Sequence, residues 1–238
     1  MGPLRRHLLL CVLALAASAT HASEPLQVRI GYLAYIPATG PLLSNVIPEP
    51  ADAGLRGAEL AIVDSNSTGR FLKHNYSLET ARADDSASLL SAAKALHQQG
   101  VRLFVLNAPA ASVRQLSQAL PDSLLFNAGS ADDELRQSAC LANVLHTLPS
   151  RAMLTDALAQ FLTVRQWQRW LLISGPTEDD QAYAAALKRA AKRFGHTIVA
   201  EKAWSFDNDQ RRSAQAEMPL FTQTAEYDVV LVADERGD

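Results

Sequence analysis

The stretch that decides the fold is DSASLLSAAKALHQQGVRLFVLNAPAASVRQLSQALPDSLLFN, residues 85–127. Its first part predicts an amphipathic helix, with a capping residue at 85–86 and a stop at Gly100. An apolar run at 101–106 then predicts a buried parallel strand. A shorter helix follows, and the chain returns as a strand at 124–127. This alternation of strands and helices is typical of a parallel sheet covered by helices.

The same alternation continues upstream of this stretch. Strand-like runs cover residues 27–32 and 76–80, and a helix between them can be capped by Asp52. Gly69 is expected just beyond the end of that helix. The apolar stripe of the helix is formed by Leu55, Ala58 and Ile62. Strands separated by helices in this way lie parallel to one another.

Residues 141–148 are expected to form an extended stretch, and a second series of elements begins near residue 148, where we place a lobe boundary. The elements expected there are a helix capped by Ser150 with Leu154, Leu158 and Phe161 on one side, a strand at 170–174, a helix at 180–194, and strands at 197–204 and 228–232. This series repeats the plan of the first. We therefore predict an α/β fold with two lobes, residues 23–148 and 149–238, each a mostly parallel sheet with helices on both faces.

The amino terminus has the layout of a secretory signal peptide. Arg5 and Arg6 precede an apolar run at 8–17, and small residues with acceptable cleavage sites follow as far as Ala22. The run is shorter than the ~20 apolar residues that span a membrane. We expect residues 1–22 to be removed on export, which would leave the mature chain in the periplasm.

The cysteines do not provide a disulfide framework. Cys11 lies inside the apolar run, without the small residue expected before a lipidated cysteine, so general secretion is favoured over lipoprotein or twin-arginine export. Cys140 is then the remaining thiol of the mature chain. Its expected role is that of a small buried hydrophobe, and pairing beyond this chain or reactivity are the alternatives.

Composition and spacing argue against several function classes. The chain has 22 Lys and Arg against 25 Asp and Glu, whereas nucleic-acid-binding proteins normally carry an excess of positive charge or a basic patch. The histidines are scattered without zinc-site spacing, and neither a phosphate-binding loop nor a Gly-x-Ser-x-Gly motif is present. We expect no nucleic acid, no metal, no cofactor and no catalytic residues.

Motifs that carry a family resemblance lie between residues 30 and 112. They are GLRGAELA at 54–61 with Asp64, Asn66 and Gly69, then Asp84-Asp85, Gly100-Val101 and APAAS at 108–112. Together these residues resemble the type I periplasmic binding proteins, the group that contains the branched-chain amino-acid receptors. The resemblance implies the two-lobed type I fold. It also implies the solute-binding component of an ABC importer, with a small-molecule ligand and a permease in the inner membrane as partners.

A narrower resemblance rests on CLANVLHTLPS at 140–150 and on the strand at Trp170 with the loop at 174–176. These segments are similar to binding proteins associated with pyrroloquinoline-quinone-dependent alcohol dehydrogenase systems. The resemblance implies a functional link to such a quinoprotein and leaves the ligand open. A periplasmic ligand sensor or regulatory subunit of the same fold is the alternative. An exported α/β enzyme is disfavoured, because no nucleophile, base or metal set is assembled.

The loops that follow the predicted strands are the expected ligand site, because open α/β sheets bind ligands beyond the carboxyl ends of their strands. In the first lobe these loops span 32–35, 107–112 and 127–131, and in the second lobe 174–181. The ligand-binding candidates are Tyr32, Tyr35, Asn107, Ala110, Ser112, Asn127, Ser130, Ser174 and Tyr183.

Several of these candidates also have a purely structural interpretation. Ser112 could hold a carboxylate together with the N–H groups of the helix that it caps, but a simple N-cap would look the same. Asn127 and Ser130 suit a turn for backbone reasons alone. Tyr183 is more readily the start of a core stripe. Ala131 stands where the amino-acid receptors usually carry a threonine, which counts against an α-amino-acid ligand.

The carboxyl end of the sequence leads to a further expectation. Type I binding proteins cross from the first lobe to the second and then return, so that several segments connect the lobes. This sequence stops at Asp238, just after a strand placed in the second lobe. We therefore expect a chain that lacks part of the second lobe and the returning part of the first.

Overall fold

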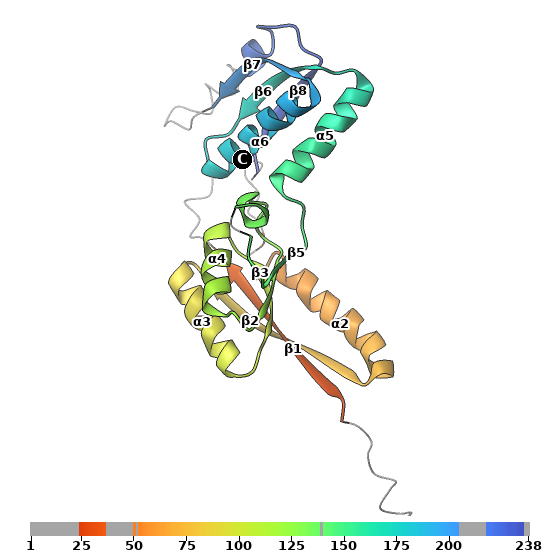
Figure 1. The fold of residues 1–238 in the computed structure, drawn as a ribbon, viewed down its shortest axis with the longest axis vertical. Helices are drawn as coiled ribbons and strands as arrows, with labels where there is room; N and C mark the ends of the chain where they lie inside the picture. Colours follow the sequence, from red (N-terminus) through yellow and green to blue (C-terminus); the bar gives the residue numbers. More distant parts are fainter. Residues whose placement is uncertain (1–23, 37–49, 51, 139, 205–217, 236–238) are drawn as a thin grey trace, which may run out of the picture.

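The computed structural model describes residues 24–36, 50, 52–138, 140–204 and 218–235 of the 238-residue chain. Two parallel sheets with their helices form two lobes that follow one another along the longest axis of the molecule (Figure 1). The predicted signal peptide, residues 1–22, lies outside the described residues. Within the described residues, no helix has the length and apolar character needed to cross a membrane.

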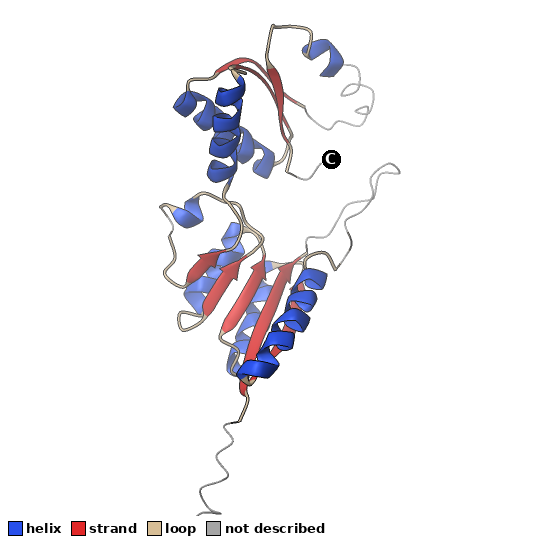
Figure 2. Ribbon diagram, turned by 90° about the vertical axis from the view of Figure 1, so that its right-hand side faces the viewer, coloured by secondary structure: helices blue, strands red, loops and turns tan. Residues whose placement is uncertain are grey.

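The first lobe is built on a five-stranded sheet with the strand order β2-β1-β3-β4-β5. The strands are β1 (Leu26–Tyr35), β2 (His74–Ala83), β3 (Leu103–Asn107), β4 (Leu124–Asn127) and β5 (Val144–His146). Every neighbouring pair is parallel, so all five carboxyl ends lie at one edge. Figure 2 shows helices on both faces of this sheet: α2 (Leu55–Leu72) on one, and α3 (Ser86–Gln98) and α4 (Ala110–Ala119) on the other.

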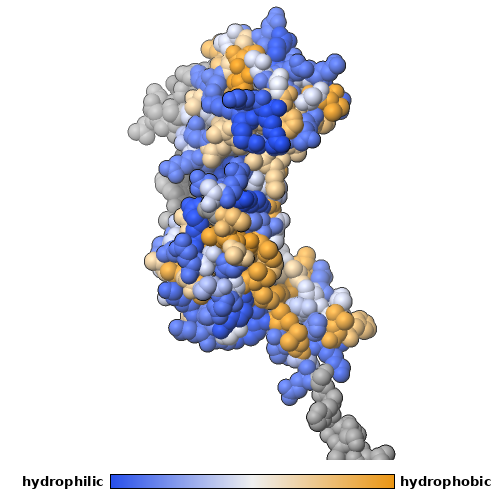
Figure 3. Space-filling view, viewed as in Figure 1, coloured by the Kyte–Doolittle hydropathy of each residue, from blue (hydrophilic) through white to orange (hydrophobic). Residues whose placement is uncertain are grey.

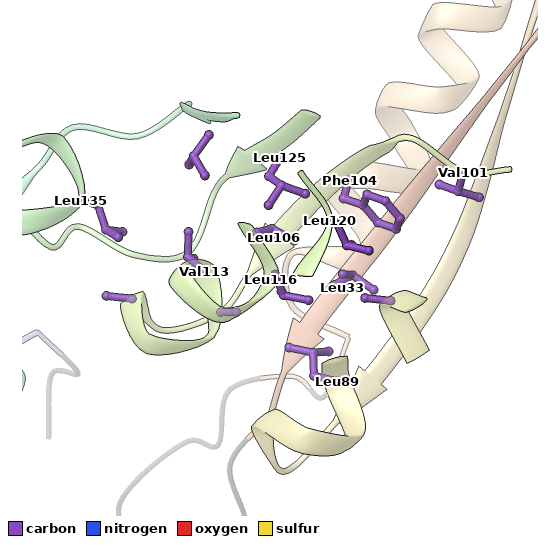
Figure 4. Packing of buried hydrophobic residues seen from close by; sticks show 14 residues of the cluster. Leu33, Leu89, Val101, Phe104, Leu106, Val113, Leu116, Leu120, Leu125 and Leu135 are labelled. Atoms are coloured by element: carbon purple, nitrogen blue, oxygen red, sulfur yellow. The ribbon is translucent and has the colours of Figure 1, made fainter. Parts of the chain in front are cut away.

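The two faces of this sheet are covered unequally. Alternate side chains of the strands, such as Leu33 and Phe104, join α3 and α4 in a fully buried apolar core (Figure 4). On the other face, Leu60, Val63 and Phe71 of α2 are 62%, 66% and 89% exposed. Figure 3 shows apolar side chains at the surface of this region. The first lobe therefore has a complete core on the α3 and α4 face and a more open face under α2.

The second lobe has a three-stranded parallel sheet with the order β7-β6-β8. Its elements are α5 (Arg151–Arg165), β6 (Arg169–Ser174), α6 (Glu178–Phe194), β7 (Thr197–Ala203) and β8 (Val229–Ala233). Trp170, at the start of β6, is fully buried and stacks on His196 with 4.4 Å between ring centroids. α5 and α6 pack against each other beside this sheet (Figure 1).

The described chain passes from the first sheet to the second through residues 147–150, which we call the crossover. A short 3-10 turn, η1 (Glu134–Arg136), packs beside it, and Arg136 donates a hydrogen bond to the carbonyl of Leu148. The backbone N–H groups of Arg151 and Ala152 then bond to the Ala131 carbonyl and to Asp133 Oδ1, both at 2.9 Å. The start of α5 is thereby fixed to the first lobe.

The predicted α/β fold, with parallel sheets flanked by helices, is confirmed. Two predicted caps are wrong. The N-cap of α4 is Pro109, so Ser112 is the third residue of the helix and cannot cap it. α2 begins after Gly54, which has a positive φ of 78°, and the carboxylate of Asp52 pairs with Arg56 instead.

The prediction that α2 ends before Gly69 is also wrong. α2 continues through Gly69. β2 passes close to the helix at this point, and a Cβ on residue 69 would lie 2.7 Å from the carbonyl oxygen of His74. The helix ends at Leu72, and its C-cap Lys73 adopts the left-handed conformation with φ 55°. Gly69 therefore provides space for a neighbouring strand and not a helix stop.

Two predictions of burial and one of strand length are corrected as well. On α5, Leu158 of the predicted stripe packs against the core, but Leu154 and Phe161 are 45% and 50% exposed, and the buried side is formed by Ala159 and Leu162. Cys140 is exposed instead of buried. The extended stretch expected at 141–148 contains only the three-residue strand β5, because only these residues pair with β4.

Candidate functional site

A cavity of about 640 Å³ lies between the two lobes, at the carboxyl ends of the strands. Its walls are formed by the last residues of β1 and β3, the loops after β3 and β4, the first turns of α4, α5 and α6, and Glu235 just beyond β8. This is where open α/β sheets bind their ligands, because loops and helix amino termini converge there. We call it the interlobe cavity.

The wall from the first lobe has an electropositive part at the start of α4, next to the carboxylate of Asp132. α4 begins at the cavity without a side-chain cap, so among the described residues nothing caps its first N–H groups, including those of Ala110 and Ala111, and they can bond to a ligand. Arg114, one turn further on, also lines the cavity. Its nearest carboxylate, Glu134, is 3.9 Å away, and within the described part of the chain its Nη1 has no hydrogen-bond partner. This part of the wall suits a carboxylate or another acceptor group.

The loop at residues 127–131 is shaped by the fully buried side chain of Asn127. Its Oδ1 accepts from the backbone N–H of Ser130 at 2.9 Å and of Gly129 at 3.3 Å, while its Nδ2 donates to the Ser130 carbonyl at 2.8 Å. A Cβ at Gly129 would lie 2.5 Å from the backbone nitrogen of Ala108, so the loop packs directly on the start of α4. Gly129, Ser130 and Ala131 then face the cavity.

The wall from the second lobe is an ion-pair cluster around Arg151. The guanidinium is bidentate to Glu235, at 2.5 Å and 2.8 Å, and bonds to Asp179 Oδ1 at 2.7 Å. The Arg151 side chain is only 9% exposed. Burial alone would lower the pKa of Arg151, but the hydrogen bond and charge of Glu235, with the charge of Asp179, hold it above its ordinary value. One cation facing two carboxylates leaves this wall with an excess of negative charge.

Asp180 holds the carboxylates of this wall in place. It forms a capping box with Thr177 at the start of α6, and its Oδ1 accepts from the backbone N–H of Glu235 at 2.9 Å. A side chain at Gly175 would collide with the Asp180 carboxylate, so only glycine fits there. The end of β8 and the start of α6 are thus fixed together next to Arg151.

Five of the nine ligand-binding candidates line the interlobe cavity: Tyr35, Asn107, Ala110, Ser130 and Tyr183. Tyr183 also packs against the core of the second lobe, so its two interpretations hold together.

The other four candidates lie elsewhere. Tyr32 lines a second cavity of about 480 Å³ under α2, where its hydroxyl accepts from Asn107 Nδ2 at 3.3 Å. Ser112 is buried and bonds to Ser86 Oγ at 2.9 Å. Asn127 and Ser174 are fully buried beneath their loops and are not on the cavity wall.

Five charged residues of the wall were not predicted as ligand contacts: Arg114, Asp132, Arg151, Asp179 and Glu235. Asp179 belongs to an acidic group that fits the start of any helix. Arg151 did carry a signal, because a cation in the first turn of a helix opposes the helix dipole and so calls for carboxylate partners nearby. Within the described residues, no group of three His, Cys, Asp or Glu side chains is arranged to hold a metal ion.

Comparison with known proteins identifies the family. A family model described as "Periplasmic binding protein" matches residues 27–233, most of the chain. The chain belongs to the periplasmic binding protein family. The family resemblance found in the sequence motifs is thereby confirmed, and a family of binding proteins agrees with the prediction that the chain is not an enzyme. No curated protein sequence matches this binding protein.

Solved structures with the same fold include an ABC transporter substrate-binding protein from Desulfitobacterium hafniense. It has a TM-score of 0.62 at 15% identity, over 88% of this chain and 58% of the other. A branched-chain amino acid ABC transporter periplasmic ligand-binding protein from Burkholderia xenovorans LB400 has a TM-score of 0.63 at 18% identity, over 82% and 51%. At such identities the likeness shows the fold alone. This binding protein spans little more than half the length of these structures.

Proposed function

We propose that this protein is the periplasmic solute-binding component of an ABC importer, and that it captures a small polar organic solute in the interlobe cavity. The single observation that carries the proposal is the position of that cavity. It lies at the carboxyl ends of both sheets, and both lobes contribute polar and charged groups to its wall. A solute held there touches both lobes at once.

Such a solute acts by stabilising the closed arrangement of the lobes. A ligand shifts a conformational equilibrium only by its differential affinity for the two states, and contacts to both walls exist only when the lobes are close. In this proposal the crossover at 147–150 acts as a hinge between the lobes. The closed form is then what the permease in the inner membrane recognises, and no bond of the solute is broken.

The charges of the two walls indicate how the solute is oriented. An acceptor group, such as a carboxylate, faces the uncapped N–H groups of α4 and Arg114, while donor groups face Asp179 and Glu235. Ala131 supplies no hydroxyl where the amino-acid receptors usually have one. An ammonium group would also suit the acidic wall. The absence of that hydroxyl is therefore the one ground on which we propose small hydroxylated acids and related products of alcohol oxidation in preference to α-amino acids.

A link to quinoprotein alcohol oxidation is part of the proposal. It is supported by the sequence resemblance at 140–150 and 170–176 and by the solute chemistry just described. In this proposal the protein serves a periplasm where a pyrroloquinoline-quinone-dependent dehydrogenase generates small acids and aldehydes. The permease partner, the periplasmic location and the dehydrogenase link are parts of one hypothesis.

The test is a thermal-shift screen of the mature protein against short hydroxy acids, aldehydes, alcohols and amino acids, followed by calorimetric titration of any hit. A solute at 100-fold its Kd should stabilise the protein by about 2.7 kcal/mol. Arg114→Gln should weaken binding of an acid by about tenfold or more, since it removes a charged hydrogen bond. Arg70→Gln, on the exposed side of α2, is the matched control and should bind normally.

A screen in which none of these classes raises the melting temperature of the folded protein would overturn the proposal. Binding that Arg114→Gln leaves unchanged would remove the electropositive part of the wall from the site. A sensor of the same fold would bind the solute but would not stimulate uptake when added to membranes that contain the permease. Uptake assays therefore separate transport from sensing.

A further inference from the structure

We propose that His146 is a positioning residue of the interlobe cavity: it holds the loop at 127–131 in its binding shape through Asn127, and protonation of its ring releases that loop. The inference rests on the proposed function only in so far as the loop serves a bound solute. The hydrogen-bond arrangement that carries it is independent of any ligand.

The orientation of the Asn127 amide is fixed by the backbone. Its Oδ1 accepts from two N–H groups, those of Ser130 at 2.9 Å and Gly129 at 3.3 Å, so the oxygen must face the loop. Its Nδ2 then donates to the Ser130 carbonyl at 2.8 Å and lies 3.0 Å from Nδ1 of His146. An amide nitrogen can only donate, and Nδ1 of His146 must therefore be the acceptor.

The second ring nitrogen of His146, Nε2, carries the proton of the neutral ring, because Nδ1 accepts from Asn127. The backbone of Leu135 favours the protonated form of the ring, and so opposes without cancelling the effects that lower the pKa of His146. A cationic ring would place a second N–H, on Nδ1, against the N–H of Asn127. Protonation therefore breaks the Asn127 contact.

The surroundings of the ring favour the neutral form. Burial lowers the pKa of His146, and the positive charge of Arg136 on η1 lowers it further. Arg136 in turn feels the negative charge of Asp133. β4, which pairs with β5 on the other side, has no charged residue. The contact is therefore complete at neutral pH and is lost as the pH falls below the unperturbed histidine value of about 6.5, through the lowered pKa.

Loss of this contact reaches the cavity through the backbone. Ser130 and Ala131 line the cavity wall, and the Ala131 carbonyl accepts from the N–H of Arg151 at 2.9 Å. Thr147, next to His146, bonds to the Asn127 carbonyl through its N–H and its Oγ1, at 3.0 Å and 3.1 Å. The same network thus joins a binding loop, the crossover and the first turn of α5.

The test compares two substitutions of His146 in the mature protein from about pH 8 to about pH 5. His146→Gln offers an amide oxygen to Asn127 and does not titrate. His146→Leu has a similar bulk but no acceptor. Hydrogen exchange of the Gly129 and Ser130 amides reports loop order, and the affinity of a solute found by screening reports function. His97→Gln, at a surface histidine paired with Asp122, is the matched control.

In the wild type and in His97→Gln, amide protection and affinity should fall together at acid pH. The fall should be about tenfold for each unit by which the pKa of His146 in the ordered loop lies below its pKa in the released loop. His146→Gln should keep the neutral-pH values at all pH values. His146→Leu should show low protection throughout. The ¹⁵N shifts of the wild-type ring should give an unprotonated Nδ1 at neutral pH, a result that requires no variant to fold.

A protonated Nδ1 at neutral pH, or an unchanged acid sensitivity of His146→Gln, would overturn the positioning role. Full Ser130 protection in His146→Leu would do the same. These readouts separate the two proposals. If the exchange and ring results hold but no solute binds, the proposed function alone is wrong, whereas solute binding with pH-independent protection refutes the role of His146 alone.

Discussion

Arg151 contacts both lobes beside the interlobe cavity, one through its backbone and the other through its side chain. Its backbone N–H bonds to Ala131 in the first lobe, and its guanidinium bonds to Glu235 and Asp179 in the second. Because it is almost fully buried, its charge must be matched where it stands. One residue therefore contributes both to the ligand site and to the relative position of the lobes.

We expect Arg151→Met to lower the free energy of unfolding by about 3 kcal/mol, because it leaves a partly buried Glu235 carboxylate without its cation. Arg151→Lys keeps the charge but loses the bidentate geometry, and should give an intermediate value. Urea unfolding followed by circular dichroism measures the difference. The control is Arg169→Met, where the ion pair is exposed and the change should be below about 1 kcal/mol. Equal losses at both arginines would contradict this interpretation.

Residues on the cavity wall were predictable from sequence when strand ends alone decided their position. Asn107 and Ser130 follow strands whose carboxyl ends are readable as apolar runs, and both line the cavity. Ser174 also ends a strand, but that strand is the central one of its sheet, and residues 170–174 are all buried. Glu235 was missed because its partner, Arg151, lies 84 positions away in sequence. Such pairings are set by tertiary structure alone.

Among the helices, α2 contains two glycines with opposite surroundings. A Cβ at Gly57 meets nothing within 4 Å, whereas a Cβ at Gly69 would collide with the backbone of His74. The helical spacing and composition of the sequence do not distinguish Gly57 from Gly69. The sequence could therefore predict that α2 exists but not where it ends, because the close approach of β2 is not a local property.

Gly57→Ala should stabilise the protein by about 0.5–1 kcal/mol, since alanine has the higher helix propensity and the position is open. Gly69→Ala should destabilise it, because backbone atoms of β2 would have to move. Thermal and urea unfolding of the two variants form a matched pair within one helix. A gain in stability at both positions would show that α2 and β2 are not in close contact.

The start of α6 depends on a reciprocal cap. Thr177 Oγ1 accepts from the N–H of Asp180 at 3.1 Å, and Asp180 Oδ2 accepts from the N–H of Thr177 at 3.0 Å. Thr177→Ala should therefore cost about 1 kcal/mol of unfolding free energy, and Thr177→Ser should restore most of it. Asp180 also holds Glu235, so the alanine variant should weaken solute binding as well. Equal stability of the alanine and serine variants would exclude this role of the cap.

In the whole molecule, the described hydrogen bonds between the lobes gather around the crossover, where residues 131–136 meet residues 148–152. Each lobe has a core of its own, one around Phe104 and the other around Trp170. The two-lobed arrangement followed from the repeated alternation of strands and helices in the sequence. The contacts that join the lobes did not, because they connect loops whose conformations depend on side chains such as Asn127 and Arg136.

Two cores with contacts concentrated at one crossover should unfold with limited cooperativity until a ligand joins them. We expect two overlapping transitions in scanning calorimetry of the free protein, because each lobe buries its own apolar surface. A solute that contacts both walls binds only when both lobes are folded, so saturation should raise the lower transition most and merge the two. Arg114→Gln should reduce this merging in proportion to its loss of affinity. A single transition in the free protein, or a solute that stabilises one transition alone, would show that the cavity is not shared between the lobes.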